Sequence, residues 1–448
     1  MPVTPPAPGT LAVDPKRADH TRHQIGVRLL PFLFILYVIN YLDRTSLAYA
    51  TLEMSRDLGF GDRIFGLGAG VFFVSYVALQ IPGAMMIERW GARRSIAAIM
   101  MAWGSLTALT ALVRSAGELY LARFALGAAE AAFFPGVVLY LSHWFIREDR
   151  AKASSNFMAA IPISFVMGSA LAGWILGRSW LGVQGWRWLF AFEGLPAILL
   201  GLAALFYLTD WPCQAAWLAP DQRQWIERKL EEERPPDRPS TTVGQALRSR
   251  IVLLLASVTF LEYLAAYSFV FWFPTILKRW SGLSDARLGW IGAVPYGVCF
   301  AAMLINGWHS DRSGERRWHA AVPQFVGAVA LLALLTRPAS TALVVVWFSV
   351  VGTMFAFLPV FWALTTEVVS TAVAAAAVGM INAVGSAAGF AGPYAFGYLR
   401  ARTGSFSCGL ALMMISALAG GLVVLAAPGA RSSKTDESPR QEQTAPCA

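Results

Sequence analysis

The sequence predicts an all-α membrane protein in which twelve transmembrane helices form two pseudo-symmetric six-helix bundles. First, hydrophobic residues make up 56% of the 448 residues, and they occur in blocks of the ~20 residues that a bilayer span requires. Second, the pattern acid-Arg-x-Gly-x-Arg-Arg occurs at 88–94 and again at 311–317, and a repeat of this period indicates a duplicated architecture. Third, the blocks near 95–113 and 405–427 lack the polar stripes of helices in a soluble core.

Apolar spans can be placed in order along the chain. The first six lie near 29–50, 64–87, 95–113, 118–145, 152–177 and 186–209. The second six lie near 251–278, 288–308, 319–336, 342–366, 372–399 and 405–427. Between the two sets we expect a short amphipathic helix from Asp221 to Glu233 and then a Pro-rich linker, because a bilayer core excludes the run of glutamates at 231–233.

These spans divide the chain into five parts. They are an N-terminal tail (1–28), an N-terminal bundle (29–209), a central loop (210–250), a C-terminal bundle (251–427) and a C-terminal tail (428–448). Lys and Arg are more numerous in the loops on the side of the two tails, so the positive-inside rule predicts that both termini are cytoplasmic. We therefore expect a multi-pass protein of the inner (plasma) membrane, and a monomer suffices for this architecture.

Composition argues against several other functions. The basic residues lie in short loops between apolar spans and not on one face of a polar domain, so no nucleic-acid partner is expected. The four cysteines are scattered, without the spacing of a metal site or a disulfide framework. No nucleophile with a base and no phosphate-binding loop is apparent, so neither enzyme activity nor a cofactor is predicted.

Five ionisable residues fall inside the predicted spans. They are Asp43, Arg44, Arg123, Glu130 and Glu262. An ionised side chain in a bilayer core costs at least ~2.5–3.5 kcal/mol, so each one requires a partner or a function. We therefore treat all five as candidate functional residues.

Arg44 is the candidate anchor for an anionic substrate. Its guanidinium is permanently charged and presents a planar fork that matches a carboxylate. Tyr37, Asn40 and Tyr41 share its helix face at spacings of three, four and seven residues, which makes one polar stripe. The alternative is an internal ion pair of Arg44 with Asp43 or Glu130 that only holds helices together.

Asp43 and Glu130 are the candidate proton carriers. Burial favours the protonated form of a carboxyl and a nearby arginine favours the ionised form, so an acid balanced between the two can change its protonation. Arg123 lies seven residues from Glu130 and so on nearly the same helix face. Permanent bridges to Arg123 are the alternative. Glu262 is a further candidate, with capping of a nearby hydroxyl as its alternative role.

The repeated turn, the twelve spans and the long central loop resemble the major facilitator superfamily over about residues 25–427. Several segments are similar to its anion:cation symporter branch. They are Asn40-Tyr41-Leu42-Asp43-Arg44, Arg123-Phe124-Ala125-Leu126-Gly127 with Glu130, Phe134-Pro135-Gly136, Gly185-Trp186-Arg187-Trp188 with Glu193-Gly194, Phe361-Trp362-Ala363-Leu364, Asn382, and Gly389-Phe390-Ala391-Gly392-Pro393. One departure is Ala84, where the family's fuller loop signature has glycine.

The resemblance implies the major facilitator fold and roles for individual residues. It assigns substrate contact to Arg44 and a place in the substrate cavity to Trp362 and Asn382, and we add Tyr41, Tyr76 and Phe361 as candidate substrate-binding residues. Branch members that carry sugar acids tend to have small polar residues before the tryptophan, whereas Pro359, Val360 and Phe361 precede it here. An aromatic or apolar monocarboxylate is therefore expected.

The resemblance implies that the two repeated turns serve conformational change and not substrate binding. Their residues are expected to latch the cytoplasmic side as a gate, with ordinary topological charge as the alternative. The candidate gate residues are Glu88, Arg89, Gly91, Arg93, Asp311, Arg312, Gly314 and Arg316. Glu193 lies close in sequence to Arg187, and a structural bridge between them is expected.

These observations together predict a proton-coupled importer of a small organic anion that works by alternating access. Its partners would be the anion, protons and the lipid bilayer. A carrier of sugar acids or dicarboxylates is the nearest alternative. A cation or drug exporter is a second, although the helix-5 Gly-Pro signature of such antiporters is missing. A non-transporting membrane receptor is the alternative from another class.

Overall fold

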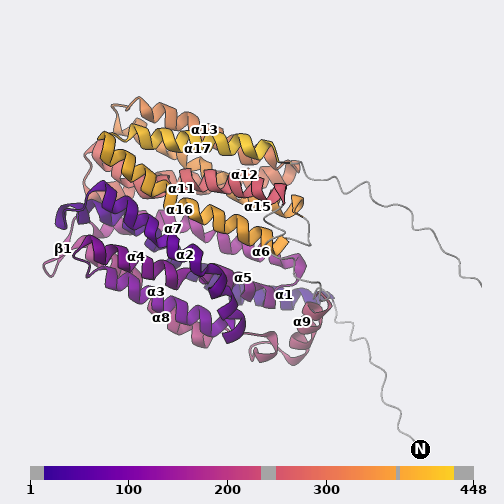
Figure 1. Ribbon diagram of the computed structural model, residues 1–448. Coiled ribbons are helices and arrows are strands. Elements are labelled where there is room, and N and C mark those ends of the chain that lie inside the picture. Colours follow the sequence, from indigo (N-terminus) through magenta and orange to yellow (C-terminus); the bar gives the residue numbers. More distant parts are fainter. Residues whose placement is uncertain (1–14, 234–248, 370–373, 428–448) are drawn as a thin grey trace, which may run out of the picture.

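The computed structural model describes residues 15–233, 249–369 and 374–427, and most of them are helical (Figure 1). The first half contains α1 (Pro15–Asp57), α2 (Asp62–Trp90), α3 (Ala92–Thr110), α4 (Ala116–Glu130), α5 (Phe133–Trp144), α6 (Arg147–Met158), α7 (Ala160–Ile175) and α8 (Gly185–Tyr207). The antiparallel strands β1 (Ser179–Trp180) and β2 (Val183–Gln184) form a short hairpin before α8. The central segment contains η1 (Pro212–Gln214) and α9 (Pro220–Glu232).

The second half has the same plan. It contains α11 (Arg250–Ser281), α12 (Asp285–Ser313), α13 (Arg317–Leu335), α14 (Thr341–Gly352), η2 (Thr353–Ala356), α15 (Phe357–Val368), α16 (Ala374–Thr403) and α17 (Ser407–Leu425). Twelve spans result when α4 with α5, α6 with α7, and α14 with η2 and α15 are each counted as one. Ten helical stretches in the described part of the chain are long and apolar enough to cross a membrane. α3, packed along α8, and α16, packed along α2 and α11, complete the twelve.

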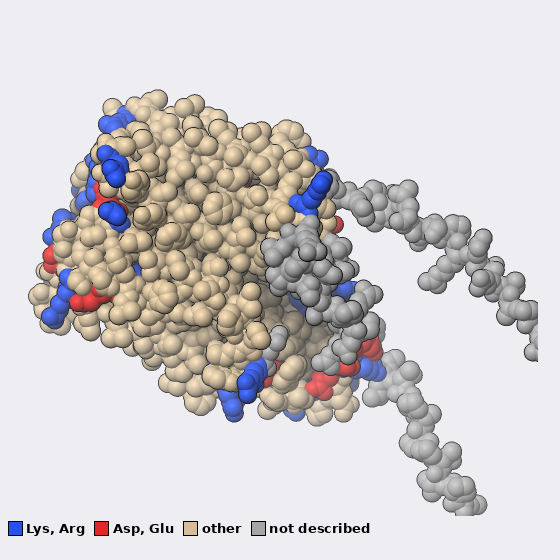
Figure 2. All heavy atoms as spheres, in the orientation of Figure 1, with Lys and Arg blue, Asp and Glu red and all other residues tan. Residues whose placement is uncertain are grey.

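The surface agrees with a membrane location. Figure 2 shows charged side chains gathered toward two ends of the visible face, with a wide uncharged band between them. Large apolar side chains such as Leu121, Ile305 and Val329 are more than half exposed. Water would oppose exposure on this scale, whereas lipid tails accept it. The predicted all-α membrane fold is therefore confirmed.

Three spans are broken one helical turn before a proline. Proline lacks an N–H and its ring clashes with the carbonyl four residues earlier. α4 ends at Glu130 ahead of Pro135, α6 ends at Met158 ahead of Pro162, and η2 interrupts the third span ahead of Pro359. Proline alone does not dictate a break, since Pro274 lies inside the continuous helix α11.

The two halves meet mainly along two helix pairs, α2 with α16 and α7 with α12, and also where α1 contacts α11. Glycines allow the backbones to approach at both main contacts. A Cβ added to Gly66 would lie 2.8 Å from the carbonyl oxygen of Pro393, and one added to Gly173 would lie 2.9 Å from the Cα of Gly289. A larger side chain at either position would push the halves apart.

The end of the bundle that carries the β1–β2 hairpin, here called the hairpin end, is held closed by ion pairs between the halves. Asp62 of α2 lies 2.7 Å from Arg279 of α11 and 3.6 Å from Arg400 of α16. Arg56 of α1 lies 2.5 Å from Asp285 of α12. At the opposite end, here called the terminal end, no ion pair among the described residues joins the two halves: Arg22 pairs with Asp149 in the first half, and Arg316 pairs with Glu367 in the second. The hairpin end is therefore the one that these pairs close.

The N-terminal helix is longer than the sequence predicted. α1 begins at Pro15, whereas residues 1–28 were expected to form a tail. The extension is polar and is held against the start of α6, because the Arg22 guanidinium lies 2.7 Å from Asp149. The predicted amphipathic helix of the central segment is present as α9 within one residue. The predicted Pro-rich linker and C-terminal tail lie outside the described residues.

Candidate functional site

A cavity lies between the two halves, and its empty space, including the open solvent at its mouth, is about 780 Å³. Its lining from the first half is Tyr37, Tyr41, Arg44, Tyr76, Phe134, Met158, Ile161 and Phe165. Its lining from the second half is Tyr263, Ala266, Tyr267, Val270, Phe355, Phe357, Leu358, Trp362, Asn382 and Ser386. The three proline-associated breaks place Phe134, Met158 and Phe355 on its wall.

Arg44 is the one cation among the described residues that line the cavity. Its Nη2 lies 2.5 Å from Oε1 of Glu130, and its Nη1 lies 3.4 Å from the hydroxyl of Tyr267 across the interface. The guanidinium also lies 4.4 Å from the ring centre of Tyr41. The internal pair with Glu130 that the sequence left open is therefore present in this state, and Arg44 still contributes to the cavity wall.

A second set of charges lies behind this pair. Arg123 is 1% exposed, and its guanidinium lies 4.8 Å from the ring centre of Phe72, which is also 5.4 Å from the Arg44 guanidinium. Asp43 is 1% exposed, and neither of its carboxylate oxygens has a hydrogen-bond partner among the described residues. It interacts electrostatically with Arg123, Arg44 and Glu130. The four groups therefore form one buried cluster in which the protonation of each acid affects the others.

Aromatic side chains make up most of the cavity wall. Tyr263 and Tyr267 of α11 lie with ring centres 5.7 Å apart. Neither was among the predicted site residues, although their spacing of four places them on one helix face. Tyr41 and Tyr76 line the wall from the first half, at the predicted site. Rings and hydroxyls around one cation suit a ligand with an apolar body and an anionic group.

The structure corrects the prediction for Phe361. This side chain is fully buried and does not line the cavity. It packs behind Trp362, with ring centres 5.6 Å apart. Neighbouring residues on a helix point about 100° apart, so Trp362 and Leu358, four positions earlier, face the cavity while Phe361 faces the core. Asn382, also predicted, lies on the wall from α16.

Two buried acids, Glu262 and Glu193, have other neighbours than the sequence predicted. Glu262 faces α17, where a Cβ added to Gly420 would collide with its carboxyl group, and it does not line the cavity. It is therefore set apart from the buried cluster. Glu193 does not bridge to Arg187; it contacts Ser46 of α1, and Arg187 lies 3.5 Å from Asp57. Sequence proximity was misleading because Arg187 and Glu193 are not one or two whole turns apart.

The first repeated turn is fixed by a residue that sequence reasoning missed. Gly91 has φ +86°, a left-handed conformation that favours glycine, and the Asp210 carboxylate lies beside it. That carboxylate accepts a 2.7 Å hydrogen bond from the backbone N–H of Arg93 and so caps the start of α3. Arg89 is exposed, and the side chain of Glu88 lies outside the described structure.

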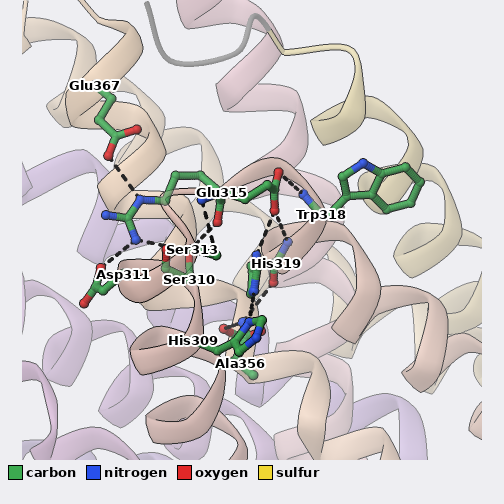
Figure 3. A network of polar contacts seen from close by, with 11 residues as sticks. His309, Ser310, Asp311, Ser313, Glu315, Trp318, His319, Ala356 and Glu367 are labelled. Atoms are coloured by element: carbon green, nitrogen blue, oxygen red, sulfur yellow. Dashed lines mark hydrogen bonds and ion pairs between the residues drawn. The ribbon is translucent and has the colours of Figure 1, made fainter. Parts of the chain in front are cut away.

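The second repeated turn forms a network at the terminal end (Figure 3). Arg316 lies 2.6 Å from Asp311, another of the predicted gate residues, and 3.1 Å from Glu367, which was not predicted. Gly314 ends α12 with φ +68°. The Arg312 guanidinium lies 5.6 Å from the ring centre of Trp308 instead of pairing with an acid. This turn therefore binds the ends of α12 and α15 within one half.

Two histidines extend this network. Nδ1 of His319 lies 2.7 Å from the Glu315 carboxylate, and its Nε2 lies 2.6 Å from Nδ1 of His309 (Figure 3). Burial alone would raise the pKa of Glu315, but hydrogen bonds from the Trp318 backbone and from His319 outweigh burial and hold that pKa below its ordinary value. The carboxylate therefore stays ionised and fixes the start of α13.

The fold and the cavity define a class. Two membrane-embedded six-helix halves with a cavity between them are the architecture of many secondary transporters. Residues 33–393 match the family model of the Major Facilitator Superfamily. The chain belongs to this superfamily.

Relatives and solved structures agree with that assignment. The chain is 39% identical over 402 residues, 88% of its length and 92% of the relative's, to a protein of Agrobacterium vitis that is named as a tartrate transporter. It is 36% identical to a quinolone resistance transporter of Acinetobacter baumannii, over 88% of this chain and 92% of the relative. A crystal structure of a D-xylose-proton symporter superposes with a TM-score of 0.72 at 16% identity, covering 91% of this chain and 98% of that chain.

Proposed function

We propose that this protein imports an organic monocarboxylate together with protons by alternating access. The observation that carries the proposal is the position of Arg44, a cation on the wall of a largely aromatic cavity between the halves. A carboxylate that enters the cavity can bind its guanidinium in a two-pronged geometry. The neighbouring hydroxyls of Tyr41, Tyr76 and Tyr267 can donate to the same oxygens.

The coupling of substrate binding to proton binding follows from competition between the substrate carboxylate and Glu130 for the Arg44 guanidinium. Glu130 occupies the guanidinium at 2.5 Å in this state. A substrate carboxylate that takes its place leaves Glu130 to share Arg123 with Asp43. A buried carboxyl that loses its paired cation is driven toward the neutral form and takes up a proton. Asp43 lies in the same cluster and shares this dependence. Substrate and proton thus bind together, and release of one favours release of the other.

The direction of transport depends on which end of the protein faces the cytoplasm. We place the terminal end in the cytoplasm by the excess of basic residues in the loops of that side, and the protein in the inner membrane. The ion pairs at the hairpin end then close the outer side, so the state described here serves release into the cell. The two bundles, 29–209 and 251–427, would rock about the cavity to expose it on the other side.

The side chain of the substrate is proposed to be aromatic or apolar. Ten of the eighteen residues on the cavity wall are aromatic, and the wall offers one cation. A dicarboxylate or sugar acid remains the second candidate, because a relative at 39% identity is named as a tartrate transporter. Asn382 and Ser386 on the wall could serve its hydroxyl groups.

A thermal-shift panel separates these candidates. The purified protein is heated with benzoate, tartrate, gluconate or a quinolone, and with chloride as the control. A ligand that binds only the folded form raises the melting temperature. We expect benzoate to raise it more than tartrate or gluconate. A larger rise with tartrate would establish the second candidate, and a rise with the quinolone alone would favour a drug exporter.

Trp362 provides a mutational test of the aromatic preference. Because Trp362 faces the cavity and Phe361 lies behind it, Trp362→Ala should weaken benzoate binding about tenfold, the effect of ~1.5 kcal/mol from a lost ring contact. Phe361→Leu is the matched control and should change affinity little. Calorimetric titration measures both. Equal loss of benzoate and tartrate affinity in Trp362→Ala would remove the basis for an aromatic substrate.

A further inference from the structure

Glu193 is a buried acid for which the mechanism above has no role. It lies on α8, eight residues or roughly 12 Å from the helix start at the hairpin end. The side chain is 3% exposed. One carboxyl oxygen contacts the hydroxyl of Ser46 on α1, and the other has no hydrogen-bond partner among the described residues.

The Ser46 hydroxyl constrains the protonation of this acid. Its Oγ lies 2.8 Å from the backbone oxygen of Leu42, where it acts as donor. A hydroxyl carries one hydrogen, so it cannot donate to Leu42 and to Glu193 at the same time. When Ser46 donates to Leu42, Glu193 must supply the hydrogen of the second bond. The geometry then describes a chain from a protonated Glu193 through Ser46 to the α1 backbone.

No described group near Glu193 compensates a negative charge. Arg187, the basic residue of the same helix, donates at 2.6 Å to the backbone oxygen of Ala111 and lies against Asp57. α3 presents the backbone of Gly104 and Ala108 to this part of α8, and α7 has no charged residue. The remaining titratable group is Asp43 of α1, which interacts electrostatically with Glu193. An ionised Glu193 would thus be buried with a single hydroxyl donor, which is costly.

We propose that Glu193 and Ser46 form a further proton-binding site, which exchanges its proton in step with Asp43. Negative charge on Asp43 disfavours a second negative charge on Glu193, so Glu193 keeps its proton while Asp43 is ionised. When Asp43 takes up a proton, this repulsion is removed, and Glu193 can then release its own proton to solvent that enters as the bundles rock. This inference rests on the proposed proton symport for its role in transport, but the proton on Glu193 can be detected without transport.

Release of that proton would change the hydrogen bonds of α1 next to the substrate site. The Ser46 hydroxyl must then turn from Leu42 to donate to the new carboxylate. The Leu42 oxygen keeps a 2.7 Å hydrogen bond from Thr45 but loses the one from Ser46. Leu42 directly precedes Asp43 and Arg44 on α1. The site therefore links proton binding on α8 to the helix turn that carries the anion anchor.

Infrared difference spectroscopy of the purified full-length protein tests this proposal, with pH as the probe. Protonated carboxyls absorb apart from carboxylates, so each buried acid can be assigned by its amide variant. We expect a protonated-carboxyl band that is lost in Glu193→Gln, shifted in frequency in Ser46→Ala, and present in Glu262→Gln, the matched buried acid of the other half. In Asp43→Asn the same band should disappear at lower pH than in the wild type.

The outcomes are decisive in both directions. A carboxyl spectrum that Glu193→Gln leaves unchanged means that Glu193 carries no proton and overturns the proposal. A Glu193 band that persists at every pH, and that Asp43→Asn does not move, makes it a static neutral acid and also overturns it. If Glu193→Gln does not fold, the frequency shift in Ser46→Ala carries the test. Failure of proton-driven uptake in the wild type would contradict the proposed function while leaving these spectra as they are.

Discussion

Arg44→Ala is expected to weaken benzoate binding by at least roughly thirtyfold. Removing one partner of a buried, hydrogen-bonded charge pair costs about 2 kcal/mol or more, and each 1.4 kcal/mol is a factor of ten. The guanidinium is the cation of the cavity wall, so no described neighbour on the wall can replace it. Calorimetric titration of the purified variant with benzoate measures the loss.

The control must separate lost binding from lost folding. Arg44→Ala also leaves Glu130 without its 2.5 Å partner, which destabilises the bundle by itself. The double variant Arg44→Ala/Glu130→Gln removes both charges and should recover stability in a thermal melt without recovering affinity. Arg63→Ala, at an exposed position of α2, should behave as the wild type. Wild-type affinity in a folded Arg44→Ala protein would show that the anion binds elsewhere.

Glu130→Gln and Asp43→Asn are expected to separate exchange from accumulation. An amide resembles the protonated acid but cannot release a proton, so the neutral variant can still cycle with substrate on both sides. In proteoliposomes, counterflow exchange of benzoate should continue while accumulation driven by a pH gradient falls to simple equilibration. Accumulation is lost because the amide cannot release a proton, so the pH gradient no longer drives the transport cycle in one direction.

Glu262→Gln is the matched control for this pair. Glu262 is as buried as Asp43, but it faces α17 outside the cluster. Its amide variant should accumulate benzoate like the wild type. Undiminished accumulation in both Glu130→Gln and Asp43→Asn would exclude these acids from coupling, and loss in Glu262→Gln alone would move the coupling site to the second half.

Much of the fold could be predicted because the membrane restricts the choices. A bilayer requires long apolar helices. In the described part of the chain, the twelve predicted spans correspond to ten stretches that qualify as membrane spans and to the helices α3 and α16. The breaks near Pro135, Pro162 and Pro359 were not predicted. Proline removes one backbone hydrogen bond at each, but Pro274 and other prolines lie inside unbroken helices, so packing and not the local sequence decides where a helix opens.

The site was predictable only where charge identifies it. Arg44, Asp43, Glu130 and Arg123 stand out because lipid excludes charges, and the structure gathers these four. Aromatic residues give no such signal in an apolar chain. The place of Tyr267 on the wall and of Phe361 behind it depends on the rotation of each helix about its axis, which the sequence pattern does not specify. The contact of Glu193 with Ser46 depends in the same way on how α8 lies against α1.

The most direct measurement is uptake of labelled benzoate into proteoliposomes that contain the purified protein, with an inward proton gradient imposed. The account predicts accumulation above the level of equilibration, with protons entering alongside benzoate. It predicts that a protonophore collapses this accumulation and that protein with Arg44→Ala shows none. Benzoate that binds the protein but only equilibrates, at a rate that the proton gradient does not change, would contradict it.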